Sequence, residues 1–346
     1  MYFMRLAVDV MGGDKGPEEL LHGIRLALAA DRSLTSVFAV GPEAELRALA
    51  QKIGLRDDRL RFHQASEVLT MDDKPVQGLR KKKDCSLLRA VELVKDGEAD
   101  AVISSGNTGG IVAASTIRLR TLEGVTRPTI ACILPSKSQA WVLVDGGANP
   151  DCTPADLVQF AVMGSAYARA MLGQARPRVG VLSNGSEETK GTELTRATVA
   201  ALRRTDLNCM GYCEGYDLFN DGVDVVVCDG FVGNIVLKTA EGLGRTVGFM
   251  LKAELKANPL RMLGALLAKG GLTRLRQRMN PDIYGGAPLL GLNGTVIKIH
   301  GSANRNALMH ALGQSARLVN NQLNQTLVQD IARATAATAG PAEGGQ

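Results

Sequence analysis

The sequence is poor in aromatic side chains and in the patterns that bind metal ions. Phe, Trp and Tyr make up 4% of its 346 residues, so it lacks the stacking surfaces on which proteins that bind single-stranded nucleic acid depend. The six cysteines include no Cys-x-x-Cys pair, and no histidine stands at zinc-site spacing from a cysteine. We therefore expect no disulfide framework, no metal site, no nucleic-acid partner and a reducing compartment.

Long apolar runs and nucleotide-binding motifs are also missing. No run of about 18 apolar residues occurs, and a strand-like segment begins near the start of the chain, so we expect neither a membrane span nor a signal peptide. The chain has no G-x-x-x-x-G-K-[ST] and no G-x-S-x-G motif, and its first turn is not G-x-G-x-x-G. These absences point to a cytoplasmic protein without a bound cofactor.

Glycine is abundant instead, with 39 residues, and it recurs directly after short apolar segments. Six such segments, each ending in Gly with small polar or acidic residues, lie at 6–14, 101–110, 141–150, 179–191, 223–234 and 295–304. Helical patterns between them predict a Rossmann-like, doubly wound α/β/α sandwich with a mostly parallel sheet. Because parallel strands end side by side at one edge, we expect the six turns to form one composite pocket.

The stretch 223–238 shows this pattern most clearly. Residues 223–228 are mostly β-branched and predict a strand buried on both faces. Asp229 and Gly230 end the strand, and we expect a helix to begin near Gly233, with Asn234 as its cap. Free N–H groups at such a helix start attract anions. Taken alone, such a turn is better explained as an ordinary strand-to-helix connection; its repetition along the chain is what favours an anion site.

Two regions depart from the strand–helix alternation. Residues 66–84, with the basic run 80–83, predict a long loop. Residues 252–279 predict a basic, leucine-rich helical segment with seven Lys or Arg against one acid, Glu254. That segment suits an anionic membrane surface, and it suits equally a helical hairpin packed on the core or in a dimer interface. We expect residues 1–335 to form a single domain and 336–346 a disordered tail.

The residues favour chemistry in which the substrate brings the nucleophile. Cys228 ends a buried strand, and the other cysteines have no evident base beside them, so inert thiols are the favoured interpretation. Backbone amides, Asn, Ser and Thr donors and a few cations can position substrates and neutralise charge. Attack of inorganic phosphate on an activated acyl group needs only such a site.

Six motifs, taken in their order, resemble those of the phosphate acyltransferase family of bacterial phospholipid synthesis (the PlsX family). They lie at 9–14 (DVMGGD), 80–84 (RKKKD), 105–109 (SGNTG), 187–191 (EETKG), 229–234 (DGFVGN) and 284–291 (YGGAPLLG), and the resemblance spans residues 4–327. It implies a fold related to phosphotransacetylases, a homodimer and peripheral attachment to the cytoplasmic membrane. It also implies transfer of a long-chain acyl group from acyl-carrier protein to phosphate, and handover of the acyl phosphate to a membrane glycerol 3-phosphate acyltransferase.

Site residues follow from the turns and the resemblance together. Lys190, expected early in a helix, is the candidate cation for phosphate or the thioester oxyanion, and Asn234 is the candidate oxyanion or phosphate donor. His300 is a candidate general acid, with a structural, hydrogen-bonded histidine as the alternative. The expected substrate and phosphate site is Asp9, Gly12, Asp14, Gly106, Asn107, Thr108, Asp145, Asn149, Glu188, Asp229 and Gly233. Of these, Gly106, Asn107 and Thr108 are the expected phosphate cradle, and the aspartates orient other groups.

Arg261, Leu263, Leu266, Leu267 and Lys269 are the expected contacts to membrane or carrier protein. Three other functions compete with the main hypothesis. They are a coenzyme-A-dependent phosphotransacetylase for short acyl groups, a hydroxyacid dehydrogenase on a related fold, and a non-catalytic membrane scaffold of lipid synthesis.

Overall fold

The computed structural model describes residues 3–187 and 189–338. The strands are β1 (Met4–Asp9), β2 (Leu34–Gly41), β3 (Leu60–Gln64), β4 (Ala101–Ser104), β5 (Thr129–Pro135), β6 (Ala140–Val144), β7 (Arg178–Leu182), β8 (Asn208–Cys213), β9 (Val225–Val227), β10 (Ala287–Leu290) and β11 (Thr295–Lys298). The helices are α1 (Gly16–Ala30), α2 (Glu43–Lys52), α3 (Pro75–Lys81), α4 (Ser86–Lys95), α5 (Thr108–Leu119), α6 (Pro154–Leu172), α7 (Glu193–Leu202), α8 (Gly230–Leu255), α9 (Pro259–Leu267), α10 (Lys269–Arg278), α11 (Arg305–Asn320) and α12 (Leu323–Thr338).

One sheet runs through the molecule in the order β3-β2-β1-β4-β11-β10-β5-β6-β9-β7-β8. Most neighbours are parallel, but β11–β10, β10–β5 and β5–β6 are antiparallel. Three reversals in succession make β6, β9, β7 and β8 run opposite to β1, β2, β3, β4 and β11. We call these two sets of parallel strands the second and the first half of the sheet.

The expectation of one composite pocket is therefore wrong. The strands of the first half have their C-terminal ends on one side of the sheet, and those of the second half have theirs on the opposite side. The turns that follow the strands therefore fall into two groups. The turns after β1, β4 and β11 lie together in the first half, and those after β6, β7 and β9 belong to the second. The alternating strands and helices gave no sign of the reversal, because the antiparallel pairing of β10 and β5 produces it and no local sequence pattern records strand direction.

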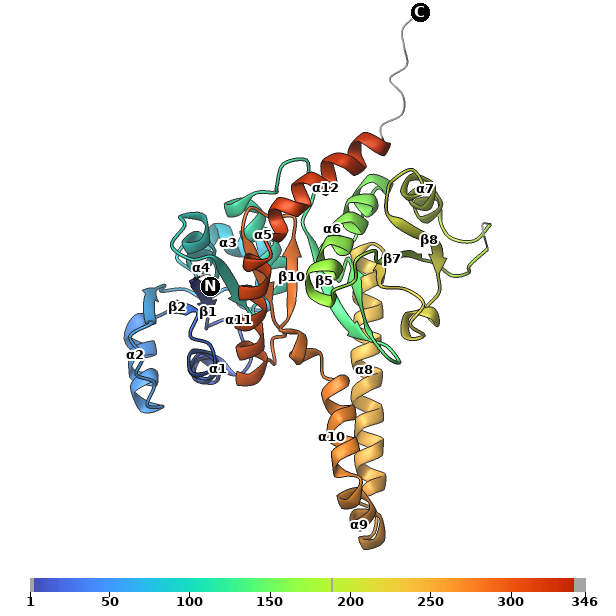
Figure 1. Ribbon diagram of the computed structural model, residues 1–346. Coiled ribbons are helices and arrows are strands. Elements are labelled where there is room, and N and C mark those ends of the chain that lie inside the picture. Colours follow the sequence, from blue (N-terminus) through green and yellow to red (C-terminus); the bar gives the residue numbers. More distant parts are fainter. Residues whose placement is uncertain (1–2, 188, 339–346) are drawn as a thin grey trace, which may run out of the picture.

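Helices cover both faces of the sheet, as an α/β/α sandwich requires (Figure 1). On one face α1, α6, α11 and α12 bury apolar side chains such as Leu20, Phe160 and Leu308. On the other face α4 and α5 bury Val91 and Ile111, and α8 adds partly buried apolar residues. The predicted fold class and its mostly parallel sheet are confirmed.

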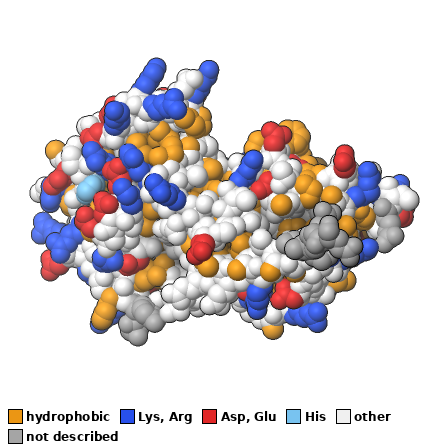
Figure 2. All heavy atoms as spheres, turned by 90° about the horizontal axis from the view of Figure 1, so that it is seen from above, with side chains coloured by type: hydrophobic (Ala, Val, Ile, Leu, Met, Phe, Trp, Pro, Cys, Tyr) orange, Lys and Arg blue, Asp and Glu red, His pale blue; other side chains and the backbone are white. Residues whose placement is uncertain are grey.

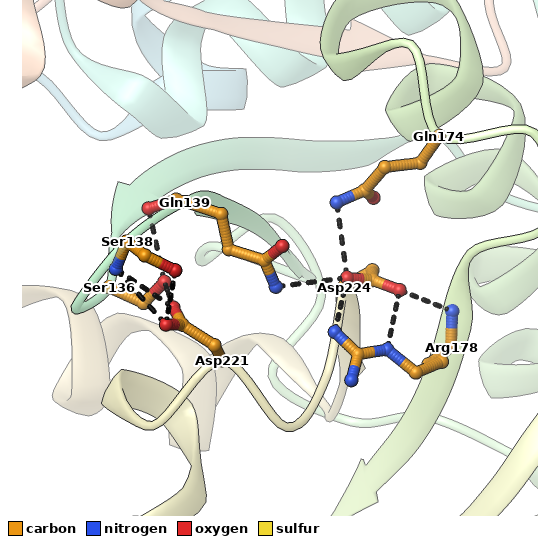
Figure 3. Close-up of polar contacts among 7 residues, drawn as sticks. All are labelled: Ser136, Ser138, Gln139, Gln174, Arg178, Asp221 and Asp224. Carbon is orange, nitrogen blue, oxygen red and sulfur yellow. Dashed lines mark hydrogen bonds and ion pairs between the residues drawn. The ribbon is translucent and has the colours of Figure 1, made fainter.

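A polar network joins the strand starts of the second half (Figure 3). Asp224, just before β9, is buried and accepts bonds from the backbone N–H of Arg178 at 2.8 Å and from its Nε at 2.9 Å. Gln139 and Gln174 donate to the same carboxylate. Nearby, Asp221 accepts bonds from the hydroxyls of two serines, Ser136 and Ser138. The network fixes how β6, β7 and β9 line up, and so where their opposite ends present the site.

Three local expectations need correction. The helix after β9 begins at Gly230, because Asp229 caps it by accepting the Val232 N–H at 2.9 Å. Asn234 thus lies inside the first turns of α8 rather than at its cap. The expected loop 66–84 contains helix α3, which has Pro75 in its first turn. At the other end α12 runs to Thr338, past the expected start of the tail; residues 339–346 lie outside the described residues.

The helical segment predicted at 252–279 is confirmed, and it is part of a larger projection. α8 has 26 residues and spans about 39 Å; it starts on the sheet and runs out of the body (Figure 1). α9, at the tip, contacts both α8 and α10, and a Cβ at Gly244 of α8 would lie 3.9 Å from Met279 Cε, just past the end of α10. Arg278 ties α10 to the body by donating to the carbonyl oxygen of Lys137 at 2.5 Å. Among the described residues, no helix is both long and apolar enough to cross a membrane.

Candidate active site

The turns of the first half pack against one another without space for side chains. A Cβ at Gly12 would lie 2.8 Å from the backbone nitrogen of Gly106. The Asp14 N–H donates to the carbonyl oxygen of Gly301 at 2.9 Å, which joins the turns after β1 and β11. Asp9 is buried beneath them and accepts the Ser104 hydroxyl at 2.7 Å. Asp9 thus orients the turns and does not face solvent, and burial raises the pKa of its carboxyl group.

Asp145 orients a turn of the second half, as Asp9 orients the turns of the first half. Its carboxylate accepts bonds from the N–H groups of Ile130, Ala148 and Asn149 and from the Asn149 side chain. Asn149 and Asp145 are buried, so they shape the turn after β6. A Cβ at Gly233 would overlap the carbonyl oxygen of Asp145, so the glycine is what lets α8 begin this close to β6.

The N–H groups of the expected phosphate cradle at the start of α5 are partly satisfied by the chain itself. The Gly106 N–H donates to the Ser104 hydroxyl at 3.1 Å. Asn107 caps α5 by accepting the Gly110 N–H at 3.1 Å, and its amide donates to the carbonyl oxygen of Met71 at 3.0 Å. Within the described part of the chain, the N–H groups of Asn107, Thr108 and Gly109 have no such bond. The structure therefore places these residues as a helix cap closed by the segment before α3.

Lys190 lies in the loop between β7 and α7, at one end of the sheet. The structure corrects its expected position: α7 begins at Glu193 and is capped by Thr192, so Lys190 precedes the helix. Its side chain is exposed, and no hydrogen bond or ion pair links it to Asn234 or His300 in residues 3–187 and 189–338. The neighbouring candidate Glu188 lies outside the described residues.

A polar stripe on α8 faces the junction between the two halves. Asn234, Lys238, Glu241 and Arg245 follow one another at spacings of four, three and four residues, which places them on one face of the helix. Asn234 lies against Gly147 in the turn after β6: a Cβ added to Gly147 would lie 3.2 Å from the Cβ of Asn234. Farther along, Glu241 Oε2 is 3.0 Å from Lys238 Nζ and 3.7 Å from Arg245 Nη2. The stripe thus leads from the second half toward the first.

His300, which follows β11, meets this stripe. Its Nε2 is 4.0 Å from Glu241 Oε2, while its Nδ1 accepts the Ser302 N–H at 3.2 Å. Burial and the nearby Lys238 lower the pKa of His300, so the ring is neutral at pH 7. Because Nδ1 is an acceptor, the neutral ring carries its hydrogen on Nε2, and that N–H points toward the stripe. His300 is therefore a hydrogen-bond donor here.

Lys298, the last residue of β11, is the cation that sequence reasoning missed. It is partly buried and pairs across the ladders with Ser104 and Ala287. Burial lowers the pKa of its amino group, and its only bond among the described residues is a 3.5 Å contact to the carbonyl oxygen of Ile299. A usable signal existed: strand alternation puts Lys298 on the same face as the buried Val296, which is an unusual place for a lysine.

None of the cysteines near the junction is poised as a nucleophile. Cys132 lies on β5, and burial raises the pKa of its thiol to about 12. Burial likewise raises the pKa of Cys152 to about 12 and that of Cys228 well above its usual value. At neutral pH these groups are thiols, not thiolates, in agreement with the inert role expected for them.

A shallow hollow of about 380 Å³ lies beside the start of α8. Its lining comes from the turn after β6 and the starts of α7 and α8, and consists of Pro150, Asp151, Cys152, Leu194, Asp229, Phe231 and Val232. Seen from above, the outline narrows between two lobes, and basic and acidic side chains are interspersed over that face (Figure 2). That face carries no continuous basic stripe of the kind that follows a nucleic-acid backbone.

Comparison with known proteins identifies the family. A family model described as "Fatty acid synthesis protein" matches residues 4–326. A phosphate acyltransferase of Syntrophotalea carbinolica is 43% identical over 326 residues, which cover 94% of this chain and 93% of that protein. The chain belongs to the phosphate acyltransferase family. It is therefore an acyltransferase of fatty acid and phospholipid synthesis, as the sequence motifs predicted. The corresponding protein of Citrifermentans bemidjiense is 46% identical over 310 residues, 89% of this chain and 87% of that one.

Solved structures place the family's fold among the phosphotransacetylases. The phosphotransacetylase of Streptococcus pyogenes aligns with a TM-score of 0.60 at 18% identity, over 93% of this chain and 94% of that chain. A branched-chain phosphotransacylase of Enterococcus faecalis aligns with a TM-score of 0.54 at 15% identity, over 91% and 99%. These likenesses concern the fold and confirm its relation to the phosphotransacetylases.

Proposed function

We propose that the protein transfers a long-chain acyl group from acyl-carrier protein to inorganic phosphate. A phosphate oxygen attacks the thioester carbonyl carbon, the C–O bond forms, the C–S bond breaks, and the carrier thiolate leaves and takes up a proton. The products are acyl phosphate and free carrier protein. The observation that carries the proposal is the junction between the halves, where N–H donors and cations gather and, among the described residues, no side chain is poised as a nucleophile.

The proposed roles follow from the position of each group. Asn234 has an exposed side-chain amide with no hydrogen bond in the described ranges, so it is available to donate to the oxyanion as it forms. His300 offers its Nε2–H to the anionic substrate where β11 ends, beside Glu241 of α8. Because a thiolate is a good leaving group, the neutral histidine serves better as a donor than as a general acid. Lys190 remains a proposed cation for an anionic substrate, supplied by the loop before α7.

We further propose that the helical projection contacts an anionic partner surface. Its α9 leucines are strongly exposed, with Leu260 at 79% and Leu267 at 82%, and seven basic residues accompany them between 252 and 279. Arg261, Leu263, Leu266, Leu267 and Lys269 are the proposed contacts to the cytoplasmic membrane or to the acidic carrier protein. Delivery at a bilayer suits an acyl phosphate, which a membrane glycerol 3-phosphate acyltransferase would then use.

The exposed apolar side of α8 supports a further proposal, that the protein is a homodimer. Leu243 and Met250 are seven residues apart and so lie on one face of a helix that leaves the body, and each is more than half exposed. Pairing with the same face of a second copy would remove this apolar surface from water. The mass in solution, measured by light scattering, tests the proposal: a monomer across the micromolar range would contradict it.

The test of the reaction is release of carrier-protein thiol from palmitoyl-carrier protein, with and without phosphate. Phosphate-dependent release, with acyl phosphate trapped as the hydroxamate, is the expected result. Turnover with short-chain acyl-coenzyme A but not with carrier protein would favour the phosphotransacetylase alternative. No turnover with either donor, in a folded protein, would favour the non-catalytic scaffold.

A further inference from the structure

Cations from the two halves of the sheet converge where α8 passes the end of β11. Lys238 and Arg245 come from α8 in the second half, and Lys298 comes from β11 in the first. His300 adds a neutral N–H donor. Residues about sixty positions apart in the sequence thus build one positively charged site. This site forms only when α8 packs against the sheet.

Where these side chains meet, the basic groups outnumber the carboxylates. Glu241 contacts Lys238 at 3.0 Å, Arg245 at 3.7 Å and His300 at 4.0 Å. Lys298 forms no ion pair with a carboxylate within the described residues, and its nearest acceptor is the carbonyl oxygen of Ile299. One carboxylate therefore faces three basic side chains, and the most buried of the three has no anionic partner.

A partly buried ammonium group without a carboxylate is costly to keep. A lysine in a purely structural role would extend its amino group into water along the protein surface. Lys298 is only partly exposed. Strand alternation turns it to the same face as Val296, the face of the sheet that α8 covers, and Lys238 and Glu241 influence the pKa of its amino group there. The arrangement is that of a site which an incoming anion completes.

Resting on the proposed function, we propose that Lys298, Lys238 and the Nε2–H of His300 bind the phosphate dianion that accepts the acyl group. Asn234 supports the assignment, because it lies one turn from Lys238, about 6 Å along the helix axis. A phosphate held by Lys238 and Lys298 would thus lie near the proposed oxyanion donor, with the thioester carbonyl between them. In this arrangement Glu241 limits how tightly phosphate binds, because it repels the same anion that the lysines attract.

Two phosphate groups that take part in this reaction fit such a site. One is inorganic phosphate, and the other is the phosphodiester on the pantetheine arm of the carrier protein. The diester carries one charge and the acceptor phosphate close to two, so the surplus of cations favours the acceptor. Kinetics separate the two sources, because loss of the site raises the KM for phosphate in the first case and the KM for acyl-carrier protein in the second.

The test measures both KM values and kcat for the full-length protein and four variants. Lys298→Met should raise the KM for phosphate about tenfold or more, as expected for loss of a hydrogen bond to a charged group, and leave the KM for acyl-carrier protein unchanged. Lys298→Arg should restore most of the affinity. Lys95→Gln removes the same charge from an exposed position at the end of α4 and should change neither value.

Glu241→Gln provides a test of opposite sign. Removing the carboxylate should lower the KM for phosphate by about fivefold, the upper range for a partly exposed charge interaction. A merely structural Glu241 would leave this KM unchanged or raise it. An unchanged KM for phosphate in both Lys298→Met and Glu241→Gln, with wild-type turnover intact, would overturn the proposal, as would an increase confined to the KM for acyl-carrier protein.

Calorimetric titration with inorganic phosphate, without acyl donor, makes the site testable apart from the reaction. Binding by the wild type that is lost in Lys298→Met supports the site even if no acyl transfer is observed. Equal binding by both overturns the site even if transfer occurs. If Lys298→Met fails to fold, as judged by its thermal unfolding, the exposed Lys238→Gln takes its place, with the same increase in KM expected.

Discussion

Substitution of Gly233 by alanine tests how closely α8 must approach the sheet. The added Cβ would overlap the carbonyl oxygen of Asp145, and this backbone atom cannot turn aside as a side chain can. Overpacking of this kind costs about 3 kcal/mol, whereas replacing a helical glycine by alanine gains about 1 kcal/mol. We expect Gly233→Ala to lower the free energy of unfolding by about 2 kcal/mol.

A matched control lies in the same helix. A Cβ at Gly248 meets nothing within 4 Å, so Gly248→Ala should raise the free energy of unfolding by up to about 1 kcal/mol. Urea unfolding followed by circular dichroism compares the two variants. Because α8 carries Asn234 and Lys238, its displacement should also lower kcat about 100-fold in Gly233→Ala. Equal stability and equal kcat in the two alanine variants would refute this reasoning.

Three further predictions concern separate parts of the molecule. Asn234→Ala should lower kcat about 100- to 1,000-fold, as loss of an oxyanion donor does, with little change in the KM for phosphate; unchanged kcat would remove it from the site. Burial raises the pKa of Asp224, but the bonds from Arg178 outweigh this and hold it below its usual range, so its stabilisation is present above about pH 4 and is lost as pH falls through the folded pKa. Asp224→Asn should therefore destabilise by about 2 kcal/mol at pH 7, a value reduced because Arg178 is partly exposed, and the difference should shrink in unfolding titrations as pH falls below about 4; a pH-independent difference would contradict this. Leu263→Gln combined with Leu267→Gln should weaken sedimentation with anionic phosphatidylglycerol vesicles without changing kcat on soluble substrate, and unchanged sedimentation would exclude α9 from the membrane contact.

Much of the fold was predictable because buried parallel strands have a plain signature. The valines of β9 and the apolar runs of β1, β4, β6, β7 and β11 each stop at a polar glycine turn, and each is a strand. Of the other strands, β5 is a buried apolar run that no polar glycine turn marks, and three were less regular. β3 and β8 lie at the edges of the sheet and are more polar, and β10 is short and contains Pro288.

The candidate site was harder to predict because it depends on strand direction. The reversal through β10 and β5 sends the two groups of turns to opposite edges, and no local pattern records it. The sequence identified Asn234 and His300 as candidates, but for the wrong reason in the case of Asn234, since Asp229 takes the capping position. Lys298 could have been found from its alternation with the buried Val296, but its nearness to α8 depends on how the helix packs on the sheet.

The central claim is that phosphate itself attacks the thioester, with no acyl group passing through the protein. Rapid mixing of palmitoyl-carrier protein with an excess of the purified protein, in phosphate-free buffer, measures the thiol released in a single turnover. The account predicts no release until phosphate is added, and then complete release. Release of one thiol per protein molecule without phosphate would reveal an acyl-enzyme and contradict the account.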